Sequence, residues 1–318
     1  MSAFVAILSW GCARSPIAPD SNPALVPLQA DFPEAWSHDG KLIAFRRVLP
    51  SNYGPPGIYL ISPAGGQPRW LCAATLFWPT RLRFSPNDRT VLAINVNELQ
   101  LIDVASGNAV KPLATNSAVT GGEWIEDGSR ILYFRSSYDP EAPRDSSWMH
   151  VLDLATGTDQ HLGFDGRDLS LESMHAGADG RVAAIEHLPT SDRLVIVDSR
   201  SAHCEVVHDT NTVPGYNNLQ WWIRPALGQV SLVFEMTHYV GWWITPGDMA
   251  PLRFAPGWNR FRLMSPDGET MVTDGTDPQT RVGVLDLASV DDITGASHRH
   301  LTSFAQPTVQ ASALDSFH

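Results

Sequence analysis

Near its start the chain reads Trp36-Ser-His-Asp-Gly-Lys-Leu-Ile-Ala-Phe45: an aromatic residue, a tight Asp-Gly turn and a second, mostly apolar strand. The pattern occurs six times, and its turn position is occupied in order by Gly40, Asp88, Gly128, Gly180, Gly228 and Gly268. These positions lie 40 to 52 residues apart. A period of that length is typical of propellers and solenoids, in which each repeat is one supersecondary unit.

A second turn follows the third strand of each repeat. It reads Leu99-Gln-Leu-Ile-Asp-Val-Ala-Ser-Gly107 in the second repeat and Met149-His-Val-Leu-Asp-Leu-Ala-Thr-Gly157 in the third. In such turns Asp side chains bond nearby backbone N–H groups, and Gly supplies a positive φ without steric cost. Alternating apolar residues between these turns predict four short antiparallel strands in each repeat.

The repeats predict an all-β fold, a six-bladed β-propeller of four-stranded antiparallel blades. The tail from Pro307 to Ser316 is similar to the first strand and turn of another repeat. A seven-bladed ring, with one blade built by the two termini together, is therefore the alternative. We expect residues 1–30 to be a leader and linker, and residues 31–318 to form the propeller. The predicted blades span residues 33–72, 79–114, 120–163, 169–208, 217–254 and 258–302.

Composition excludes some classes of partner. The 318 residues carry a net charge of −12, and a nucleic-acid partner would require a basic surface. No apolar run is long enough to cross a bilayer, and we expect a monomer. The three cysteines have no metal-binding spacing, so we expect Cys72 and Cys204 to be small buried apolar residues. A disulfide between these two is the alternative.

The first residues contain the only targeting signal. An apolar stretch from Ala3 to Leu8 is followed by Cys12, which is similar to the end of a bacterial lipoprotein signal. No Lys or Arg precedes the stretch, and Trp10 stands where a small residue is expected. We expect a periplasmic or extracellular protein, and Cys12 is the candidate residue for a lipid anchor. The alternative is that the first residues are an unprocessed tail.

The repeat motif is an aromatic residue, Ser-Pro-Asp-Gly, an apolar strand, then a strand ending in Asp and Gly, and finally Leu-Thr. Its best copies are Trp36 to Phe45, Met264 to Val272, Val282 to Ser289 and Leu301-Thr302. This motif resembles the propeller repeat of the TolB family over residues 33–302. The resemblance implies a propeller of a family that includes periplasmic protein-interaction modules, gating propellers of prolyl-oligopeptidase-type enzymes and oligogalacturonate lyases. No Gly-x-Ser-x-Gly elbow is present, which argues against a peptidase.

Charged residues fall on the strands that we expect to line the central channel. They are Arg81, Arg83, Glu123, Glu172, Arg260 and Arg262. In the low dielectric of a channel, planar guanidinium groups can clamp an anionic ligand such as a uronate carboxylate. The alternative is that the arginines pair with the acids and hold neighbouring blades together.

The fifth repeat departs most from the motif and is rich in aromatic residues. Tyr239, Trp242 and Trp258 lie beside Gly or Pro, so we expect them to form an exposed platform for a sugar or a protein. The alternative is that aromatic residues here fill the gaps between blades.

Histidines are weak candidates for a site. His298 and His300 fall on one face of a predicted outer strand and can offer two metal ligands, although a solvated edge is the simpler interpretation. We expect His175 and His187 to be hydrogen-bonded residues near the inner strands. The turn residues Asp39, Asp127, Asp179 and Asp267 recur in equivalent turns, so we interpret them as structural.

Two functions remain open from the sequence. The first is a non-catalytic binding module that holds a protein or carbohydrate ligand on one face or at the channel mouth, without a cofactor. The alternative, implied by the TolB-like resemblance, is a lyase that acts on an acidic oligosaccharide and uses a divalent cation. Paired carboxylates of the kind used in glycoside hydrolysis are not evident, and the sequence assigns no catalytic residue.

Overall fold

A computed structural model gives the structure of this protein. It describes residues 31–48, 55–73, 81–95, 98–114, 118–125, 127–137, 146–166, 169, 171–177, 180–188, 190–209, 217–224, 229–236, 240–247, 252–253, 263–276, 283–289 and 299–301. In this described part of the chain, the strands pair into six four-stranded antiparallel sheets. Each sheet uses four strands that are consecutive in the sequence.

Sheet 1 contains β1 (Asp31–Trp36), β2 (Ile43–Arg47), β3 (Gly57–Ile61) and β4 (Arg69–Cys72), and sheet 2 contains β5 (Arg81–Phe84), β6 (Thr90–Asn95), β7 (Glu98–Asp103) and β8 (Ala109–Ala114). Sheet 3 contains β9 (Ala118–Ile125), β10 (Arg130–Ser137), β11 (Ser146–Asp153) and β12 (Asp159–His161), and sheet 4 contains β13 (Leu171–Ala176), β14 (Arg181–His187), β15 (Asp192–Asp198) and β16 (His203–Asp209). Sheet 5 contains β17 (Asn217–Arg224), β18 (Gln229–Met236), β19 (Val240–Ile244) and β20 (Leu252–Arg253), and sheet 6 contains β21 (Leu263–Met264), β22 (Thr270–Thr276), β23 (Gly283–Ser289) and β24 (Arg299–His300).

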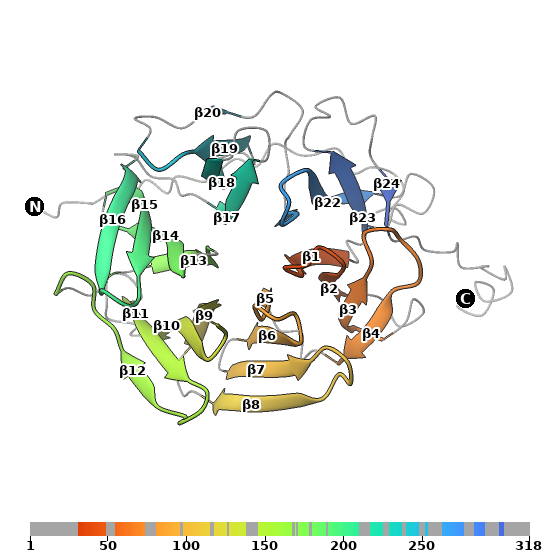
Figure 1. The fold of residues 1–318 in the computed structure, drawn as a ribbon, viewed down its shortest axis with the longest axis horizontal. Coiled ribbons are helices and arrows are strands. Elements are labelled where there is room, and N and C mark those ends of the chain that lie inside the picture. Colours follow the sequence, from red (N-terminus) through yellow and green to blue (C-terminus); the bar gives the residue numbers. More distant parts are fainter. Residues whose placement is uncertain are drawn as a thin grey trace, which may run out of the picture.

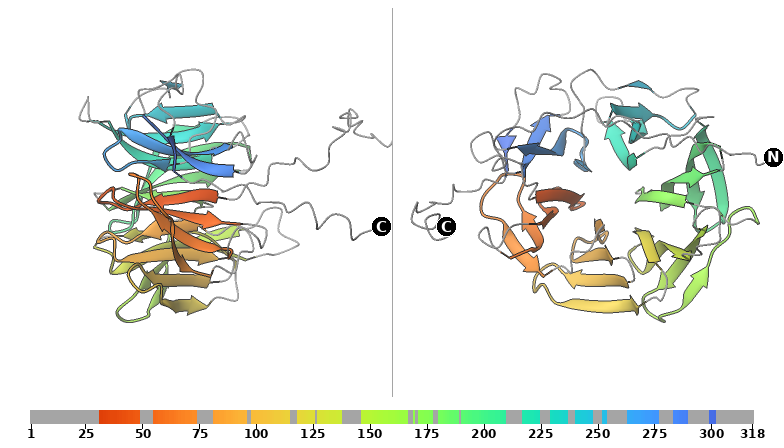
Figure 2. Two further views of the ribbon diagram at one scale, coloured as in Figure 1. Left: turned by 90° about the vertical axis from the view of Figure 1, so that its right-hand side faces the viewer. Right: turned by 180° about the vertical axis from the view of Figure 1, so that it is seen from behind.

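The sheets stand around a common centre as the blades of a propeller (Figure 1). The first strand of each blade faces the centre and the fourth faces outward, and the blades follow one another in chain order (Figures 1 and 2). The prediction of an all-β propeller with four-stranded antiparallel blades is confirmed. The terminal segments on which a seventh blade would depend lie outside the described residues.

Apolar side chains from neighbouring sheets form the core. One buried cluster joins Phe134 of sheet 3 to Met174 of sheet 4, and another joins Phe45 of sheet 1 to Leu285 of sheet 6. Each fully buried side chain of this size stabilises the fold by about 1.5–3 kcal/mol. Because both faces of a blade are apolar, a blade is stable only between its neighbours.

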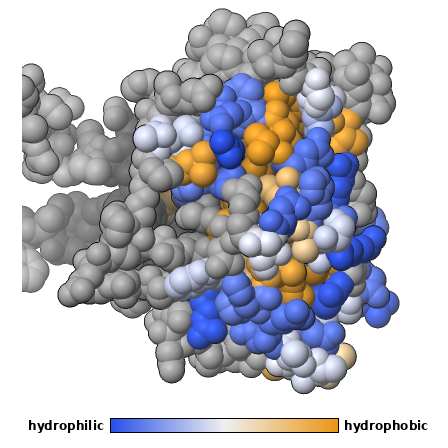
Figure 3. Space-filling model, turned by 90° about the vertical axis from the view of Figure 1, so that its left-hand side faces the viewer, coloured by the Kyte–Doolittle hydropathy of each residue, from blue (hydrophilic) through white to orange (hydrophobic). Residues whose placement is uncertain are grey.

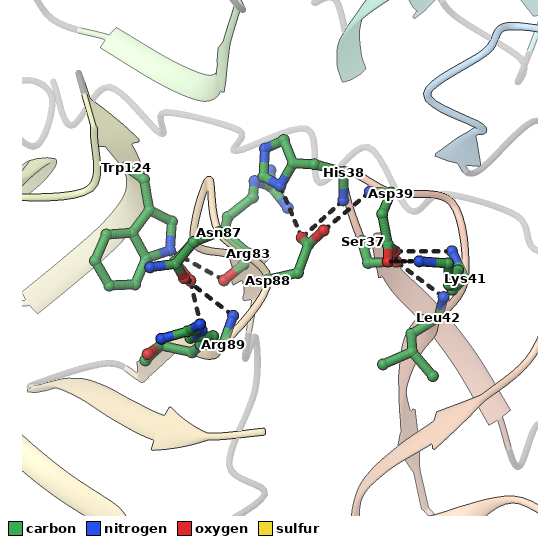
Figure 4. A network of polar contacts seen from close by, with 12 residues as sticks. Ser37, His38, Asp39, Lys41, Leu42, Arg83, Asn87, Asp88, Arg89 and Trp124 are labelled. Atoms are coloured by element: carbon green, nitrogen blue, oxygen red, sulfur yellow. Dashed lines mark hydrogen bonds and ion pairs between the residues drawn. The ribbon is translucent and has the colours of Figure 1, made fainter. Parts of the chain in front are cut away.

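Side chains within the Asp-Gly turns form a repeated network. Ser37 Oγ donates to Asp39 Oδ1 at 2.8 Å and accepts from Leu42 N at 2.8 Å (Figure 4). Ser85 with Asn87, and Ser265 with Asp267, repeat this arrangement. Hydrogen bonds from Lys41 lower the pKa of Asp39 to about 2.

The interpretation of the turn aspartates as structural is confirmed where they are described. Asp39 and Asp267 accept bonds inside their own turns, and Asp127 accepts from Ser129 N at 3.0 Å. Asp179 lies outside the described residues.

Two tryptophans, Trp36 on β1 and Trp124 on β9, each tie their inner strand to the preceding blade. Trp124 Nε1 donates to the carbonyl of Arg83 at 3.1 Å, and Trp36 Nε1 donates to the carbonyl of Leu263 at 3.4 Å. Arg83 and Leu263 hold the same position in their repeats, one residue before Phe84 or Met264. Sheet 6 therefore meets sheet 1 in the same way that sheet 2 meets sheet 3, which closes the ring.

Replacing Trp36 or Trp124 with phenylalanine should lower the free energy of unfolding by about 1 kcal/mol, the usual contribution of one hydrogen bond. Phe84 already occupies this position in the second repeat, so the smaller ring fits. Urea unfolding followed by circular dichroism measures the change. Trp70, which is 48% exposed on β4, is the control, and Trp70→Phe should leave stability unchanged. An unchanged unfolding midpoint in both ring variants would contradict the role of these bonds.

Candidate functional site

A cavity of about 680 Å³ opens at the centre of the ring, where the inner strands end in the Asp-Gly turns. Its walls come from β1, β5, β9, β13 and β21, from the turns that follow them, and from two segments of sheet 5. The apolar wall includes Trp36, Phe84, Pro86, Trp124, Val230, Pro246, Met264 and Pro266. The charged and imidazole groups on the wall are Glu34, His38, Arg83, Glu123, His175 and Arg181. A concave, mainly apolar site with a few convergent polar groups is the usual form of a ligand pocket.

Arg83 bridges four sheets beneath this cavity. Its Nε donates to the carboxylate of Glu123 in sheet 3, and its Nη1 donates to the carbonyl of Leu82 at 2.8 Å. Nη1 also donates to the carbonyl of Glu34 in sheet 1 at 3.4 Å, and Nη2 donates to the carbonyl of Met174 in sheet 4 at 3.2 Å. The guanidinium group therefore fixes the positions of several inner strands at once.

Two carboxyl groups are buried around this guanidinium. Burial raises the pKa of Glu123, and the positive charge of Arg83 opposes that effect. Burial also raises the pKa of Glu34, against the charges of Arg46, Arg81 and Arg83. Arg46 Nε lies 3.4 Å from Glu34 Oε1 across the β1–β2 pair. The positive charges of the arginines therefore partly offset the effect of burial on the pKa of both carboxyl groups.

His175 lies on the inner strand β13, as the sequence predicts, and lines the cavity. Burial, together with the charges of Arg83 and His38, lowers the pKa of His175 to about 3. The imidazole is therefore neutral at physiological pH, and it is a weak base. His187 lies on the second strand, β14, where its Nδ1 is 2.7 Å from Asp192 Oδ1.

The contact between His38 and Asp88 on the cavity rim is a feature that sequence reasoning missed. Asp88 Oδ1 accepts from the backbone N of His38 at 2.8 Å and lies 3.0 Å from His38 Nδ1 (Figure 4). Asp88 Oδ2 accepts from the backbone N of Asp39 at 2.9 Å. The signal was present in the repeat, because Asp88 occupies the turn position at which the other copies carry glycine.

The structure brings together two of the predicted channel residues. Arg83 lies on β5 and Glu123 on β9, and the two form an ion pair. The alternative interpretation, that the arginines pair with the acids and hold neighbouring blades together, predicts this pair. Arg81 lies on β5, close enough to Glu34 for its charge to lower the pKa of that carboxyl. Glu172 lies on the inner strand β13. A ligand-binding role for these four residues stays a prediction.

The other predicted site residues cannot be placed with respect to the cavity. Trp242 is part of β19 and His300 is part of β24, an outer strand, but their side chains lie outside the described residues. Also outside them are Cys12, Tyr239, Trp258, Arg260, Arg262 and His298.

Several general predictions can be compared with the described residues. Cys72 and Cys204 are buried and form no disulfide, as expected. Within the described residues, no cluster of three or more His, Cys, Asp or Glu side chains has a geometry suited to a metal ion. The described segments also contain no helix with the length and apolar character needed to span a membrane.

No family model matches the chain, and no curated protein matches it. The solved structure of TolB from Acinetobacter baumannii superposes with a TM-score of 0.60 at 14% identity, covering 81% of this chain and 63% of that one. The chain has the fold of the TolB-like propellers. It spans less than two thirds of that TolB chain, so the comparison concerns the propeller alone.

Other solved structures are similar to a comparable degree. An oligogalacturonate lyase in complex with manganese has a TM-score of 0.54 at 14% identity, covering 86% of this chain and 77% of that one. The propeller domain of the Trilobed protease from Pyrococcus furiosus has a TM-score of 0.52 at 16% identity, covering 88% and 86%. At these identities the comparisons establish the fold, and the resemblance of the repeat to the TolB family is confirmed at that level.

Proposed function

We propose that this TolB-like propeller is a binding module that holds a carbohydrate or protein ligand in the cavity at the channel mouth. The observation that carries the proposal is the cavity itself, with about 680 Å³ of space between apolar walls and a cluster of charged groups. That volume falls within the range of about 300–1,000 Å³ that is usual for small-ligand pockets. A periplasmic or extracellular location is part of the proposal, in line with the signal-like start of the sequence and the TolB-like fold.

A lyase that acts on an acidic oligosaccharide is the competing function. It needs an arginine available for the uronate carboxylate and a base for proton abstraction. The guanidinium of Arg83 instead donates to Glu123 and to three backbone carbonyls, and His175 is a weak base. These contacts argue against Arg83 as the group that holds a uronate and against His175 as the base.

Narrowing the cavity should weaken binding strongly without affecting the fold. Val230 is 48% exposed and lies on the cavity wall, so Val230→Trp should weaken binding by about tenfold or more because it fills space that the ligand needs. Calorimetric titration with cellohexaose, chitohexaose, maltohexaose, oligogalacturonate and a peptide library measures the change. An unchanged melting temperature shows that the fold is intact.

Val206→Trp is the matched control, because Val206 is 46% exposed on the outer strand β16 and lies away from the cavity. The outer surface on this side of the ring is a mixture of apolar and polar patches, so an added apolar side chain fits its character (Figure 3). Equal affinity in wild type and Val230→Trp would contradict the site. An increase in ultraviolet absorbance from an unsaturated product, on incubation with oligogalacturonate and Mn²⁺, would favour the lyase.

A further inference from the structure

Two residues that break the repeat contact each other. The position two residues after the start of the motif is proline in the second and sixth repeats, Pro86 and Pro266. In the first repeat this position is His38. The turn glycine of the other repeats is replaced by Asp88 in the second. His38 and Asp88 are 50 positions apart, yet the imidazole Nδ1 lies 3.0 Å from the carboxylate Oδ1 (Figure 4).

Asp88 occupies this position at a conformational cost. Its φ is 57°, in the left-handed region that glycine adopts freely and other residues rarely do. In return its carboxylate accepts from the backbone N–H groups of His38 and Asp39 in the neighbouring blade. A proline at position 38 would lack the first of these N–H groups. Those backbone bonds explain why residue 38 is not proline, but they do not require an imidazole.

The carboxylate of Asp88 determines which nitrogen of His38 carries the proton. An ionised carboxylate only accepts hydrogen bonds, so Nδ1 is the protonated nitrogen and Nε2 of the neutral ring is an acceptor. A carboxylate that holds Nδ1–H in this way also fixes the orientation of the ring, as in catalytic triads. The His38 side chain is 55% exposed and lines the cavity, so the ring can contact a ligand there. The same cavity wall carries Glu123 and His175, so the ring faces the channel groups.

We propose that His38 is the residue with which the cavity recognises its ligand. Its Nε2 accepts a hydrogen bond from a hydroxyl group of a neutral carbohydrate. Asp88 is the positioning residue that holds the imidazole ring in place. This inference rests on the proposed function.

The groups around His38 determine the ligand chemistry. Glu34 and Glu123 are acceptors, and Arg83 is engaged within the protein. Arg181 supplies the other cationic group on the wall. A neutral sugar offers hydroxyl groups to this set and adds no charge to a wall whose two acidic residues are already paired with Arg46 and Arg83.

The protonation of His38 can be measured without a ligand. Long-range ¹H–¹⁵N correlation spectra of the full-length protein should show Nδ1–H for His38, with an unprotonated Nε2 in the neutral ring. Asp88→Gly introduces the residue that other repeats carry at this position, and it should shift His38 toward the Nε2–H form that predominates in free imidazoles. A neutral His38 ring with its proton on Nε2 in the wild type would overturn the positioning role of Asp88.

Binding to cellohexaose, chitohexaose, maltohexaose and oligogalacturonate then tests the ligand contact. We expect a neutral sugar to bind, and His38→Ala to lose about tenfold in affinity, the equivalent of one hydrogen bond. Asp88→Gly should lose a similar factor. His38→Ala retains the backbone N–H bond to Asp88, so the turn remains capped. Lys41→Ala is the control in the same turn, because Lys41 is 78% exposed and does not line the cavity.

The outcomes separate this inference from the proposed function. If Val230→Trp abolishes sugar binding and His38→Ala retains full affinity, the cavity remains the site and the role of His38 is wrong. Preference for oligogalacturonate over every neutral sugar would overturn the ligand chemistry. If no sugar binds but a peptide does, at a site blocked by Val230→Trp, the proposed function stands and the carbohydrate inference fails. Failure of every probe to bind the wild type would overturn both.

Discussion

Replacing Arg83 with alanine is expected to lower the free energy of unfolding by about 3–5 kcal/mol, the range observed when one partner of a buried ion pair is removed. Glu123 is almost completely buried, and its carboxylate accepts from Arg83 Nε. The variant would also lose the bonds from Arg83 to the carbonyls of Glu34 and Met174 in two other sheets. Urea unfolding monitored by tryptophan fluorescence measures the difference.

A double variant tests whether the loss comes from an uncompensated charge. Arg83→Leu combined with Glu123→Leu removes both charges, and such replacements are often close to neutral in stability. We expect the double variant to be more stable than Arg83→Ala. If Arg83→Ala instead unfolds like the wild type and only loses affinity for an anionic oligosaccharide, Arg83 is a ligand clamp and not a link between blades.

The loss in free energy of unfolding caused by Arg83→Ala should also depend on pH. Burial raises the pKa of Glu123, and loss of the Arg83 charge, which lowers that pKa, raises it further. A carboxyl group with a raised pKa in the folded state stabilises the fold when protonated, and this contribution is lost as the pH rises through that pKa. The variant should therefore be closer to the wild type at acid pH than at neutral or alkaline pH. A deficit that grows toward acid pH would contradict this explanation.

Replacing Asp31 with alanine should have an effect of similar size, about 3–5 kcal/mol. Asp31 is completely buried, and its two oxygens accept from Arg47 Nε and Nη2 at 2.8 Å each. The guanidinium of Arg47 lies 4.7 Å from the ring centroid of Tyr59 and 5.4 Å from that of Phe45. Without Asp31, a cation among aromatic rings would lose its bidentate carboxylate.

A partly exposed ion pair provides the control for Asp31. Arg193 Nε donates to Asp209 at 2.7 Å, but both side chains are accessible to water. Asp209→Ala should therefore cost about 1 kcal/mol or less. Thermal and urea unfolding of the two variants, measured together, decide the comparison. Equal losses would mean that burial does not determine the strength of these pairs.

The fold could be predicted from the sequence because its turns are formed by residues close together in the chain. Ser37 and Asp39, for example, bond within a single turn, and equivalent residues repeat that arrangement in other blades. The predicted blade boundaries agree with the observed strands to within a few residues for the same reason. Such local chemistry can be recognised in any one copy of the repeat.

The candidate site could be predicted only in part, because its contacts join different repeats. The inner-strand position of Arg83 and Glu123 was predictable, and pairing was one of two interpretations of them. Glu34 was not recognised because β1 has an irregular register between Pro33 and Ala35, and simple alternation along a strand does not reveal such a bulge. His38 was missed because its significance depends on Asp88, which belongs to the next repeat.

The contacts of Arg83 also place a positive charge at the centre of the ring. Sheets 1 and 4 face each other across the ring, and one guanidinium group donates to Glu34 O of β1 and to Met174 O of β13 (Figure 1). That group therefore lies near the ring axis, on the wall of the cavity. The same side chain thus joins inner strands and lines the candidate site. Substitutions at Val230, which lies on the cavity wall in sheet 5, can change the cavity without removing that link.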